Sequence, residues 1–304
     1  MSSAAEVRPF TSTDGASLHA LLRVIHAHDG CAPLGDGPLR ELADDAGFAG
    51  FAVPGSTAGL LAGYAHVSGP GPGGWELAVV VHPSVRDTDT ADLLVGAALG
   101  HVASEGGGPV HWWVFSPTPN DDERAARHGF SVGRDLEQQR VPLPLGEEPE
   151  WAPGIKVRTF VPGRDEAAWV VMNNAAFAGH PEQGGWDVAT LARRELEPWF
   201  APEGFLLAED DDGLVGACWT KLHQEPEGAA GEIYVVAVHP SRGGQGLGRA
   251  LTIAGLASMY ERGAQTGLLY VDASNAAATK LYRSLGFVTT RVDRAYVRDV
   301  VPAT

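Results

Sequence analysis

Apolar positions in this chain follow two spacings, one typical of helices and one typical of strands. Leu18, Leu21 and Ile25 recur at helical spacing, whereas short apolar runs end at turns such as Pro54-Gly55. The pattern predicts the first elements in this order: a strand at 7–10, helices near 18–25 and 39–46, strands at 47–53, 60–67 and 76–81, a helix at 90–104, a strand at 110–115, a helix at 120–128 and a closing strand at 130–143.

The same order of elements begins again after a stretch rich in proline and glutamate at 142–153. Residues 157–160 echo residues 7–10, and further features recur at a common offset of 157 residues. The matched features are Pro83 and Pro240, Leu94 and Leu251, Val114 and Val271, and Gly129-Phe130 and Gly286-Phe287. Matches in register over this distance indicate a duplicated domain. We therefore predict an α+β protein with tandem domains at 1–141 and 155–304, joined by a linker at 142–154.

The composition narrows the classes of partner. A chain of 304 residues is long enough for two domains of about 150 residues each. Its 38 acidic and 22 basic residues give a net charge of −16, which argues against nucleic acid or anionic membranes and is compatible with a cationic substrate. Cys31 and Cys218 cannot form a disulfide framework. Without a signal-peptide pattern or an apolar run near ~18 residues, we expect a cytoplasmic protein, and we expect a monomer.

A glycine-rich loop in the second half is the main candidate for ligand binding. The apolar run Ile233–Val238 predicts a strand that stops at His239-Pro240, and four glycines follow between positions 243 and 248. Apolar residues at helical spacing then begin at Leu247. Glycines let backbone N–H groups approach an anion, and a helix start adds unsatisfied donors. Neither nucleotide-binding glycine motif is present, so we expect a cradle for another phosphate-bearing ligand, with an ordinary tight turn as the alternative.

Glu232 is the candidate general base. It lies on the predicted strand 231–238, where strict alternation would place it on one face with Tyr234, Val236 and Val238. A carboxylate on a strand that leads to the glycine loop could remove the proton from an ammonium substrate before its nitrogen attacks. The alternative is a glutamate at the end of a strand that simply faces solvent.

Tyr282 is the candidate general acid. It lies in the predicted helix 275–285, which Asn275 can cap, and a phenol can give its proton to a departing thiolate. The alternative is an aromatic ring that packs on the sheet. Lys221, at the end of another strand, would ordinarily be a solvated edge charge. His180 lacks a partner at metal-ligand spacing, so we expect no metal.

Two of these segments resemble motifs of the GCN5-related N-acetyltransferases. The family loop reads Gln/Arg-x-x-Gly-x-Gly/Ala, and Gly246 and Gly248 match its fourth and sixth positions. Gly243 stands at the first position, with Arg242 one residue early. The second motif, N-x-x-A-x-x-[LF]-Y-x-x-x-G-F, matches residues 275–287. The resemblance implies two acetyltransferase domains, each a mixed central sheet flanked by helices. It also implies acetyl-CoA as co-substrate, a strand glutamate as base and a tyrosine that protonates the CoA thiolate.

The repeat predicts that only the second half carries this chemistry. At the offset of 157 residues, Asp89 replaces Gly246, where a carboxylate would repel a pyrophosphate and its Cβ would block close approach of the backbone. Trp75 takes the place of Glu232, and Ala125 takes the place of Tyr282. We therefore expect the first half to have a degenerate cofactor loop and to shape the acceptor site.

Within the family, the tandem layout and the segments 173–186, 219–221, 231–238 and 281–287 resemble one group of enzymes. These enzymes acetylate the cysteinyl amine of a cysteinyl-glucosaminyl-inositol conjugate. The resemblance implies substrate contacts at Asp36, where the family commonly has glutamate, and at Glu182, Lys221, Glu232 and Tyr270. It implies acetyl-CoA contacts at Val236, Ala237, Val238, Gly243, Gly244, Gln245, Gly246, Leu247, Gly248, Arg249, Asn275, Ala276, Ala277, Ala278, Thr279 and Lys280. The residues alone leave open another amine acceptor or a non-catalytic acyl-CoA sensor.

Overall fold

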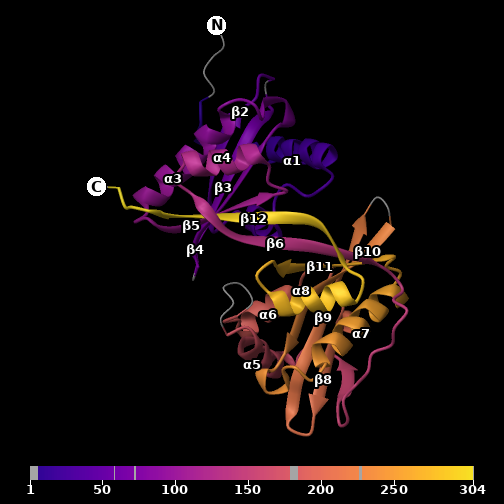
Figure 1. Cartoon of the computed structure of the whole chain (residues 1–304). Helices are drawn as coiled ribbons and strands as arrows, with labels where there is room; N and C mark the ends of the chain where they lie inside the picture. The colour runs from indigo at the N-terminus through magenta and orange to yellow at the C-terminus, as the bar shows by residue number, and fades with distance from the viewer. Residues whose placement is uncertain (1–5, 58, 72, 179–183, 226–227, 304) are drawn as a thin grey trace. The chain divides into compact units, whose positions relative to one another are not determined.

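The computed structural model describes residues 6–57, 59–71, 73–178, 184–225 and 228–303. These residues form two compact units (Figure 1). The first unit consists of two segments of the chain, the residues up to Asp135 and those from Val292 onward. The second unit is the segment between them, Leu136–Arg291. The division therefore differs from the halves of the sequence repeat.

The first unit has a mixed sheet with helices on both faces. Its strands follow the order β1-β2-β3-β4-β5-β12, with β4 and β5 parallel and the other neighbours antiparallel. The elements up to β6 are β1 (Arg8–Pro9), η1 (Ser12–Asp14), α1 (Gly15–Asp29), α2 (Asp36–Asp44), β2 (Phe48–Pro54), β3 (Leu61–Gly71), β4 (Gly74–Val81), η2 (Pro83–Val85), α3 (Thr90–Ser104), β5 (Gly108–Phe115), α4 (Pro119–Arg127) and β6 (Ser131–Pro142).

The second unit repeats this architecture. Its strands follow the order β7-β8-β9-β10-β11-β6, with β10 and β11 parallel and the other neighbours antiparallel. The remaining elements are β7 (Lys156–Thr159), α5 (Glu166–Ala176), α6 (Val188–Glu195), η3 (Pro202–Gly204), β8 (Phe205–Asp210), β9 (Gly213–Glu225), β10 (Gly228–Val238), η4 (Pro240–Arg242), α7 (Leu247–Glu261), β11 (Thr266–Asp272), α8 (Ala276–Ser284) and β12 (Val288–Val300).

The last strand of each half completes the sheet of the other unit. β6 pairs with β11 from Leu136↔Asp272 to Pro142↔Thr266, whereas β12 pairs with β5. The stretch expected to be a linker also contributes to the second unit, because Leu143 is buried and Trp151 packs against the same core. The boundary at 142–154 follows the sequence repeat, while the compact units follow the strand pairing.

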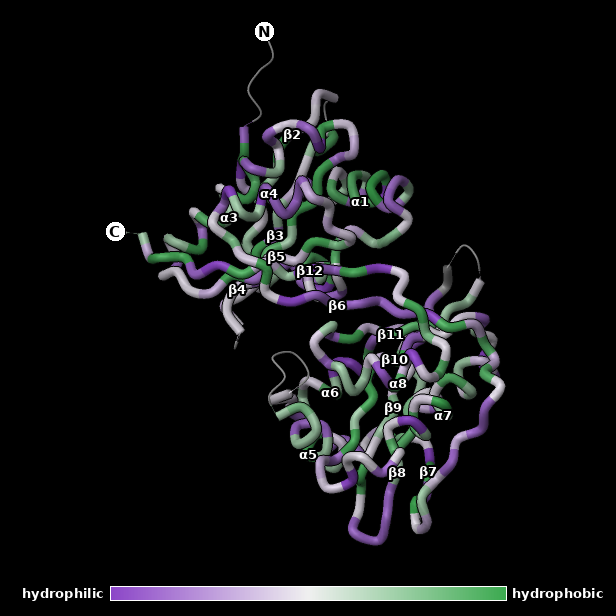
Figure 2. The backbone as a smooth tube through the Cα atoms, in the orientation of Figure 1, coloured by the Kyte–Doolittle hydropathy of each residue, from purple (hydrophilic) through white to green (hydrophobic). Residues whose placement is uncertain are grey.

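Each sheet has an apolar core on both faces. In the second unit, one core lies under α7 and α8 and includes Leu251 and Met259, and the other lies under α5 and includes Trp169 and Trp219. Apolar and polar residues alternate along α1, as expected of a helix with one buried face (Figure 2). Within the described ranges, no helix combines the length and the apolar character needed to cross a membrane.

Candidate active site

A β-bulge in β10 determines which side chains line the candidate site. The ladder between β9 and β10 pairs Ile233 with Thr220 and Val235 with Trp219. Tyr234 is therefore an extra residue on β10, and the alternation of its side chains reverses at this point.

The bulge corrects the predicted face of β10. A side chain at Gly231 would meet Met259 of α7, so the neighbouring Glu232 points to the opposite, α5 side of the sheet. Tyr234 packs in the core under α5, whereas Val236 and Val238 pack against the core under α7 and α8. The prediction that Glu232 shares a face with Val236 and Val238 is therefore wrong, because the extra residue breaks the period of two.

The strands β10 and β11 separate beyond the bulge. Their parallel pairing runs from Ala230↔Thr266 to Ile233↔Leu269. Val236–Val238 pair with β9 on one side, and the β10–β11 ladder as described does not reach them on the other. Backbone N–H and C=O groups on this edge of β10 are thus available to a ligand that enters between the strands.

Backbone conformation requires glycine at two of the four loop positions. Gly244 and Gly246 have φ angles of 73° and 81°, in the left-handed region that side chains other than glycine rarely adopt. Gly243 has a φ of −59°, which any residue can adopt. Gly246 is also the N-cap of α7, so the loop presents its bare backbone directly beside the start of a helix.

The two arginines of the loop have partners within the second unit. Arg242 donates from Nε to Asp210 Oδ2 at 2.9 Å, and Arg249 donates from Nη1 to Ser284 Oγ at 2.9 Å and pairs with Glu147. The arginine one residue early is thus held by a carboxylate. The groups of this loop that could meet an anion are therefore its backbone N–H groups and those at the N-terminus of α7.

The Glu232 carboxylate lies in a partly closed environment. Its side chain is 11% exposed, and its Oε2 lies 2.6 Å from Nε2 of His223 on β9. The ladder places Lys221 directly across from Glu232, but the Lys221 ammonium lies over the rings of Trp199 and Tyr234, at 5.0 and 6.0 Å from their centroids. The structure therefore brings the predicted base and the predicted substrate lysine to neighbouring positions on one face.

Tyr270 lies on the same face of the sheet, on β11. Leu268, two residues before Tyr270 on β11, pairs with Glu232 on β10. Because residues two apart on a strand point to the same face, Tyr270 and Glu232 lie on the same face of the sheet. Tyr270 accepts a hydrogen bond on its hydroxyl from Gln138 Nε2 at 2.8 Å, and its side chain remains exposed. The hydroxyl thus stands at a surface that a polar ligand can reach.

Tyr282 is buried on the opposite face of the sheet. The residue is 6% exposed, and its ring packs against Phe287 at 5.7 Å between centroids. Burial raises the pKa of the Tyr282 phenol, with a further contribution from Cys218. The Cys218 thiol is fully buried, and burial raises its pKa to about 12, so the thiol stays protonated. The Tyr282 phenol and the Cys218 thiol are thus both neutral groups in this part of the core.

The helix α8 begins as the sequence predicts. Asn275 accepts a hydrogen bond on its side-chain oxygen from the backbone N–H of Ala278 at 3.1 Å, which confirms its capping role. Thr279 has a buried hydroxyl with no hydrogen-bond partner among the described residues, and Lys280 is exposed. The N-terminus of α8 therefore offers polar groups close to the buried Tyr282.

Two predicted substrate residues lie outside the described part of the second unit. Asp36 begins α2 and belongs to the first unit. Glu182 lies outside the described residues, as do His180 and Gln183. Among the described residues, no group of three or more His, Cys, Asp or Glu side chains is placed to hold a metal ion.

The first unit has the same turn before the loop as the second unit, but it lacks the left-handed backbone at the position of Gly246. In each unit a histidine at the end of a strand accepts from the serine N–H two residues on, His82 from Ser84 and His239 from Ser241. After this shared turn the chains differ, because Asp89 has a φ of −78° where Gly246 is left-handed. The turn is thus present in both units, whereas the left-handed backbone of Gly246 is not found at the corresponding Asp89.

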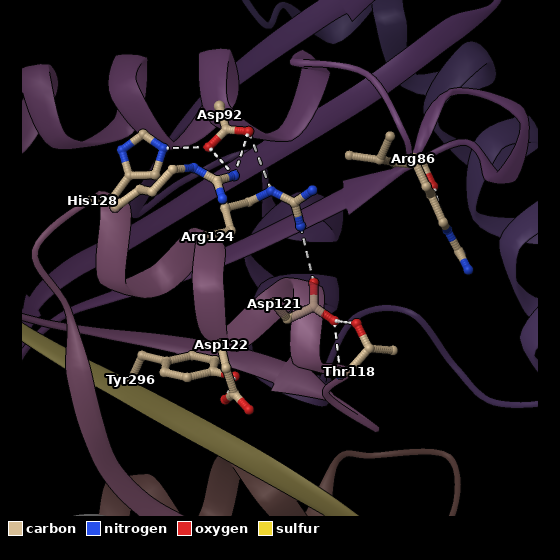
Figure 3. A network of polar contacts seen from close by, with 10 residues as sticks. Arg86, Asp92, Thr118, Asp121, Asp122, Arg124, His128 and Tyr296 are labelled. Atoms are coloured by element: carbon tan, nitrogen blue, oxygen red, sulfur yellow. Dashed lines mark hydrogen bonds and ion pairs between the residues drawn. The ribbon is translucent and has the colours of Figure 1, made fainter.

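A network of ion pairs links α3 and α4 in the first unit (Figure 3). Asp92 accepts from His128 Nε2 at 2.9 Å and from Arg124 at 3.4 Å, and Arg124 reaches Asp121 at 3.0 Å. Arg86 is held separately by Asp29. In the first unit, the arginines near residues 86–91, which correspond to the glycine loop of the second unit, are therefore paired with carboxylates.

His223 is the residue of the site that sequence reasoning missed. Its contact with Glu232 joins two strands, and the pairing of β9 with β10 sets which residues meet. The segment Trp219–Lys221 on this strand resembles a family motif, but His223 lies two residues beyond it and has no distinctive spacing in the sequence.

Comparisons with known proteins agree with this architecture. The profile of the acetyltransferase (GNAT) family matches residues 172–287. A GCN5-related N-acetyltransferase from Sphaerobacter thermophilus has a TM-score of 0.76 at 24% identity, covering 98% of this chain and 96% of that one. A tandem GNAT protein from the clavulanic acid biosynthesis pathway has a TM-score of 0.74 at 16% identity, covering 98% and 99%. These structures support the fold.

Curated relatives extend the similarity over most of the chain. A mycothiol acetyltransferase of Thermobispora bispora is 46% identical over 245 residues, covering 78% of this chain and 80% of the relative. A mycothiol acetyltransferase of Geodermatophilus obscurus is 41% identical over 311 residues, covering 98% and 99%. With a tandem fold, a glycine loop at a helix start and these relatives, the chain belongs to the mycothiol acetyltransferase family of GCN5-related, acyl-CoA-dependent N-acetyltransferases.

Proposed function

We propose that the protein transfers the acetyl group of acetyl-CoA to the cysteinyl amine of cysteinyl-glucosaminyl-inositol, which yields mycothiol. The observation that carries this proposal is the Glu232 carboxylate on β10, the strand that leads to the glycine loop, in a chain whose relatives bear the name of this activity. Acetyl transfer to an amine needs a proton acceptor for the attacking nitrogen and a site that holds acetyl-CoA, and the second unit offers a candidate for each.

The backbone of the second unit supports the binding of acetyl-CoA. The left-handed glycines Gly244 and Gly246 leave room for close approach of the pyrophosphate, and the N-terminus of α7 adds donors and a positive dipole end. The edge of β10 at Val236–Val238 can hydrogen-bond the extended part of the molecule. These features fit the predicted contacts at 243–249, and α8 offers those at 275–280.

The two proposed catalytic residues lie on opposite faces of the sheet. Glu232 takes one proton from the acceptor's ammonium, so that the amine nitrogen can form a bond to the acetyl carbon. The N–H near Val238 polarises the thioester carbonyl as negative charge develops on its oxygen. Tyr282 donates its phenolic proton to the CoA sulfur as the carbon–sulfur bond breaks. The nitrogen loses its second proton as the tetrahedral intermediate collapses to the amide. That proton restores the Tyr282 phenol, and the proton held by Glu232 passes to solvent as the one net proton released.

For the acceptor, we propose contacts with Lys221 and Tyr270. Both lie on the face of the sheet that carries Glu232, and the acceptor is rich in hydroxyl groups that such side chains can hydrogen-bond. The roles of Asp36 and Glu182 stay predictions from the sequence.

An acceptor panel tests the proposal. Thiol release from acetyl-CoA is measured with the cysteinyl conjugate, free cysteine, a polyamine, an aminoglycoside and a peptide amine. We expect kcat/KM for the conjugate to exceed that for the other amines by about 100-fold or more, because a site that hydrogen-bonds a polar substrate rejects analogues lacking its groups. Equal rates with unrelated amines would contradict the proposed acceptor, and no thiol release with any amine would contradict catalysis.

A further inference from the structure

The contact between His223 and Glu232 is the basis of an inference that goes beyond the proposed roles. Nε2 of His223 lies 2.6 Å from Oε2 of Glu232, a distance typical of a short, charge-assisted hydrogen bond. His223 is the one residue within the described chain that hydrogen-bonds the Glu232 side chain. It therefore acts on one of the two carboxylate oxygens and leaves Oε1 for another partner.

The chemistry of the pair assigns its proton. A general base acts in its ionised form, and an ionised carboxylate only accepts hydrogen bonds, so in that form of Glu232 the proton of this contact belongs to Nε2 of His223. The imidazole then presents Nδ1 on its other side, and its side chain is 30% exposed, so water can reach it. The Glu232 side chain is 11% exposed and depends on its neighbours for its orientation.

The ladder explains why a histidine, and not the adjacent lysine, performs this role. Lys221 stands directly across from Glu232, yet its ammonium is directed over the rings of Trp199 and Tyr234. His223 is two residues further along β9, on the same face, so its ring reaches Glu232 diagonally. The carboxylate is thus held by a planar donor at one oxygen while the lysine is held by aromatic rings.

We propose that His223 is a positioning residue for the general base: its Nε2–H fixes Oε2 of Glu232, so that Oε1 faces the amine of the acceptor. This inference rests on the proposed function of Glu232. A carboxylate with one oxygen fixed has fewer orientations to lose when the acceptor binds, so the effect should be seen in the proton-transfer step and not in acetyl-CoA binding.

A double-mutant cycle tests the proposal. His223→Leu removes the donor, and we expect it to lower kcat about tenfold or more, with the Kd of acetyl-CoA unchanged. His223→Gln can still donate from its amide and should recover most of the wild-type kcat. In the Glu232→Gln background, His223→Leu should have less than about a twofold further effect, because a residue that acts through Glu232 cannot act without it.

Control measurements separate this role from a loss of folding. His111→Leu makes the same substitution on strand β5, and we expect kcat to stay at the wild-type value. Calorimetric titration with acetyl-CoA confirms that each variant retains its fold. Wild-type kcat in His223→Leu, a glutamine variant as slow as the leucine variant, or additive effects in the cycle would each overturn the proposal. If the wild type acetylates a different amine, the acceptor assignment fails, and the same cycle is run with that amine.

Discussion

Glycine at position 246 can be required for two physical reasons, the left-handed backbone and the space that a Cβ would take from a ligand. Its φ of 81° is in the left-handed region, and no atom of the described part of the chain lies within 4 Å of an added Cβ. A substitution would therefore strain the backbone without a clash inside the protein. Gly263, just after α7, has a φ of 99° and an equally open surrounding. The two positions share the cost of a left-handed backbone, but only Gly246 is at the proposed cofactor loop.

Gly246→Ala should therefore weaken acetyl-CoA binding, while Gly263→Ala should not. We expect both variants to lose about 1–2 kcal/mol of stability from backbone strain. Only Gly246→Ala should raise the Kd of acetyl-CoA, by about tenfold, because its Cβ occupies space that the pyrophosphate would approach. Calorimetric titration and thermal unfolding of the pair measure the two effects. Equal affinities for acetyl-CoA in both variants would contradict the assignment of the loop.

Tyr282 offers a second prediction at the scale of one residue. Burial raises the pKa of its phenol above the ordinary value near 10, so the acid stays protonated throughout the neutral range. Tyr282→Phe should lower kcat by about 100-fold with the KM of acetyl-CoA little changed. The neutral phenol also contributes stability that is complete below pH ~10 and is lost as the pH rises further. A wild-type rate that falls between pH 7 and 9 through tyrosine ionisation would contradict the assignment.

At the scale of elements, an arginine–aspartate ion pair links the first strand to the start of the first helix in each unit. Arg8 on β1 contacts Asp14 at 2.6 Å, and Arg158 on β7 contacts Asp165 at 2.5 Å. Asp165 also accepts from the backbone N–H of Val161 at 2.8 Å. The duplicated Val-Arg-x-Phe segments recognised in the sequence therefore correspond to a duplicated contact.

The Asp165 pair predicts a loss of stability in acid. Burial alone would raise the pKa of Asp165, but hydrogen bonds from Arg158, Arg164 and the backbone outweigh burial and lower it to about 2. Because this pKa is lowered, its contribution is complete above pH ~4 and is lost as the pH falls toward 2. Asp165→Asn should cost on the order of 2 kcal/mol at pH 7 and flatten the pH dependence of unfolding below pH 4. The exposed Asp211→Asn is the control, and equal stability of the two variants at pH 7 would contradict this account.

Local patterns in the sequence predicted many elements and fewer of the contacts between them. The helix at 90–104 and the cap at Asn275 are confirmed, because both depend on residues close in the chain. The bulge at Tyr234 was missed, since strict alternation has no local signal for one extra residue. The His223–Glu232 contact was missed for a related reason, because it depends on how one strand registers with its neighbour.

At the scale of the whole molecule, the exchange of β6 and β12 makes each unit depend on the other half of the sequence. The two strands lie at corresponding places in the repeat, so each can complete the edge that β5 or β11 presents. The sequence shows the duplication but not which copy a closing strand joins, because both copies of the edge are similar. The second unit consequently contains residues from both sides of the predicted linker.

Two fragments of similar length should therefore behave differently. The fragment 136–291 contains five whole strands of the second unit and the part of β6 that pairs with β11, and we expect it to fold and to bind acetyl-CoA with an affinity close to that of the full chain. The fragment 155–304 follows the sequence repeat but lacks β6, so the edge of β11 is unpaired and the core loses Val141 and Leu143. An unpaired edge invites association with other chains, so we expect this fragment to aggregate. Gel filtration, thermal unfolding and calorimetric titration compare the two, and a monomeric 155–304 with the stability of 136–291 would show that β6 is dispensable.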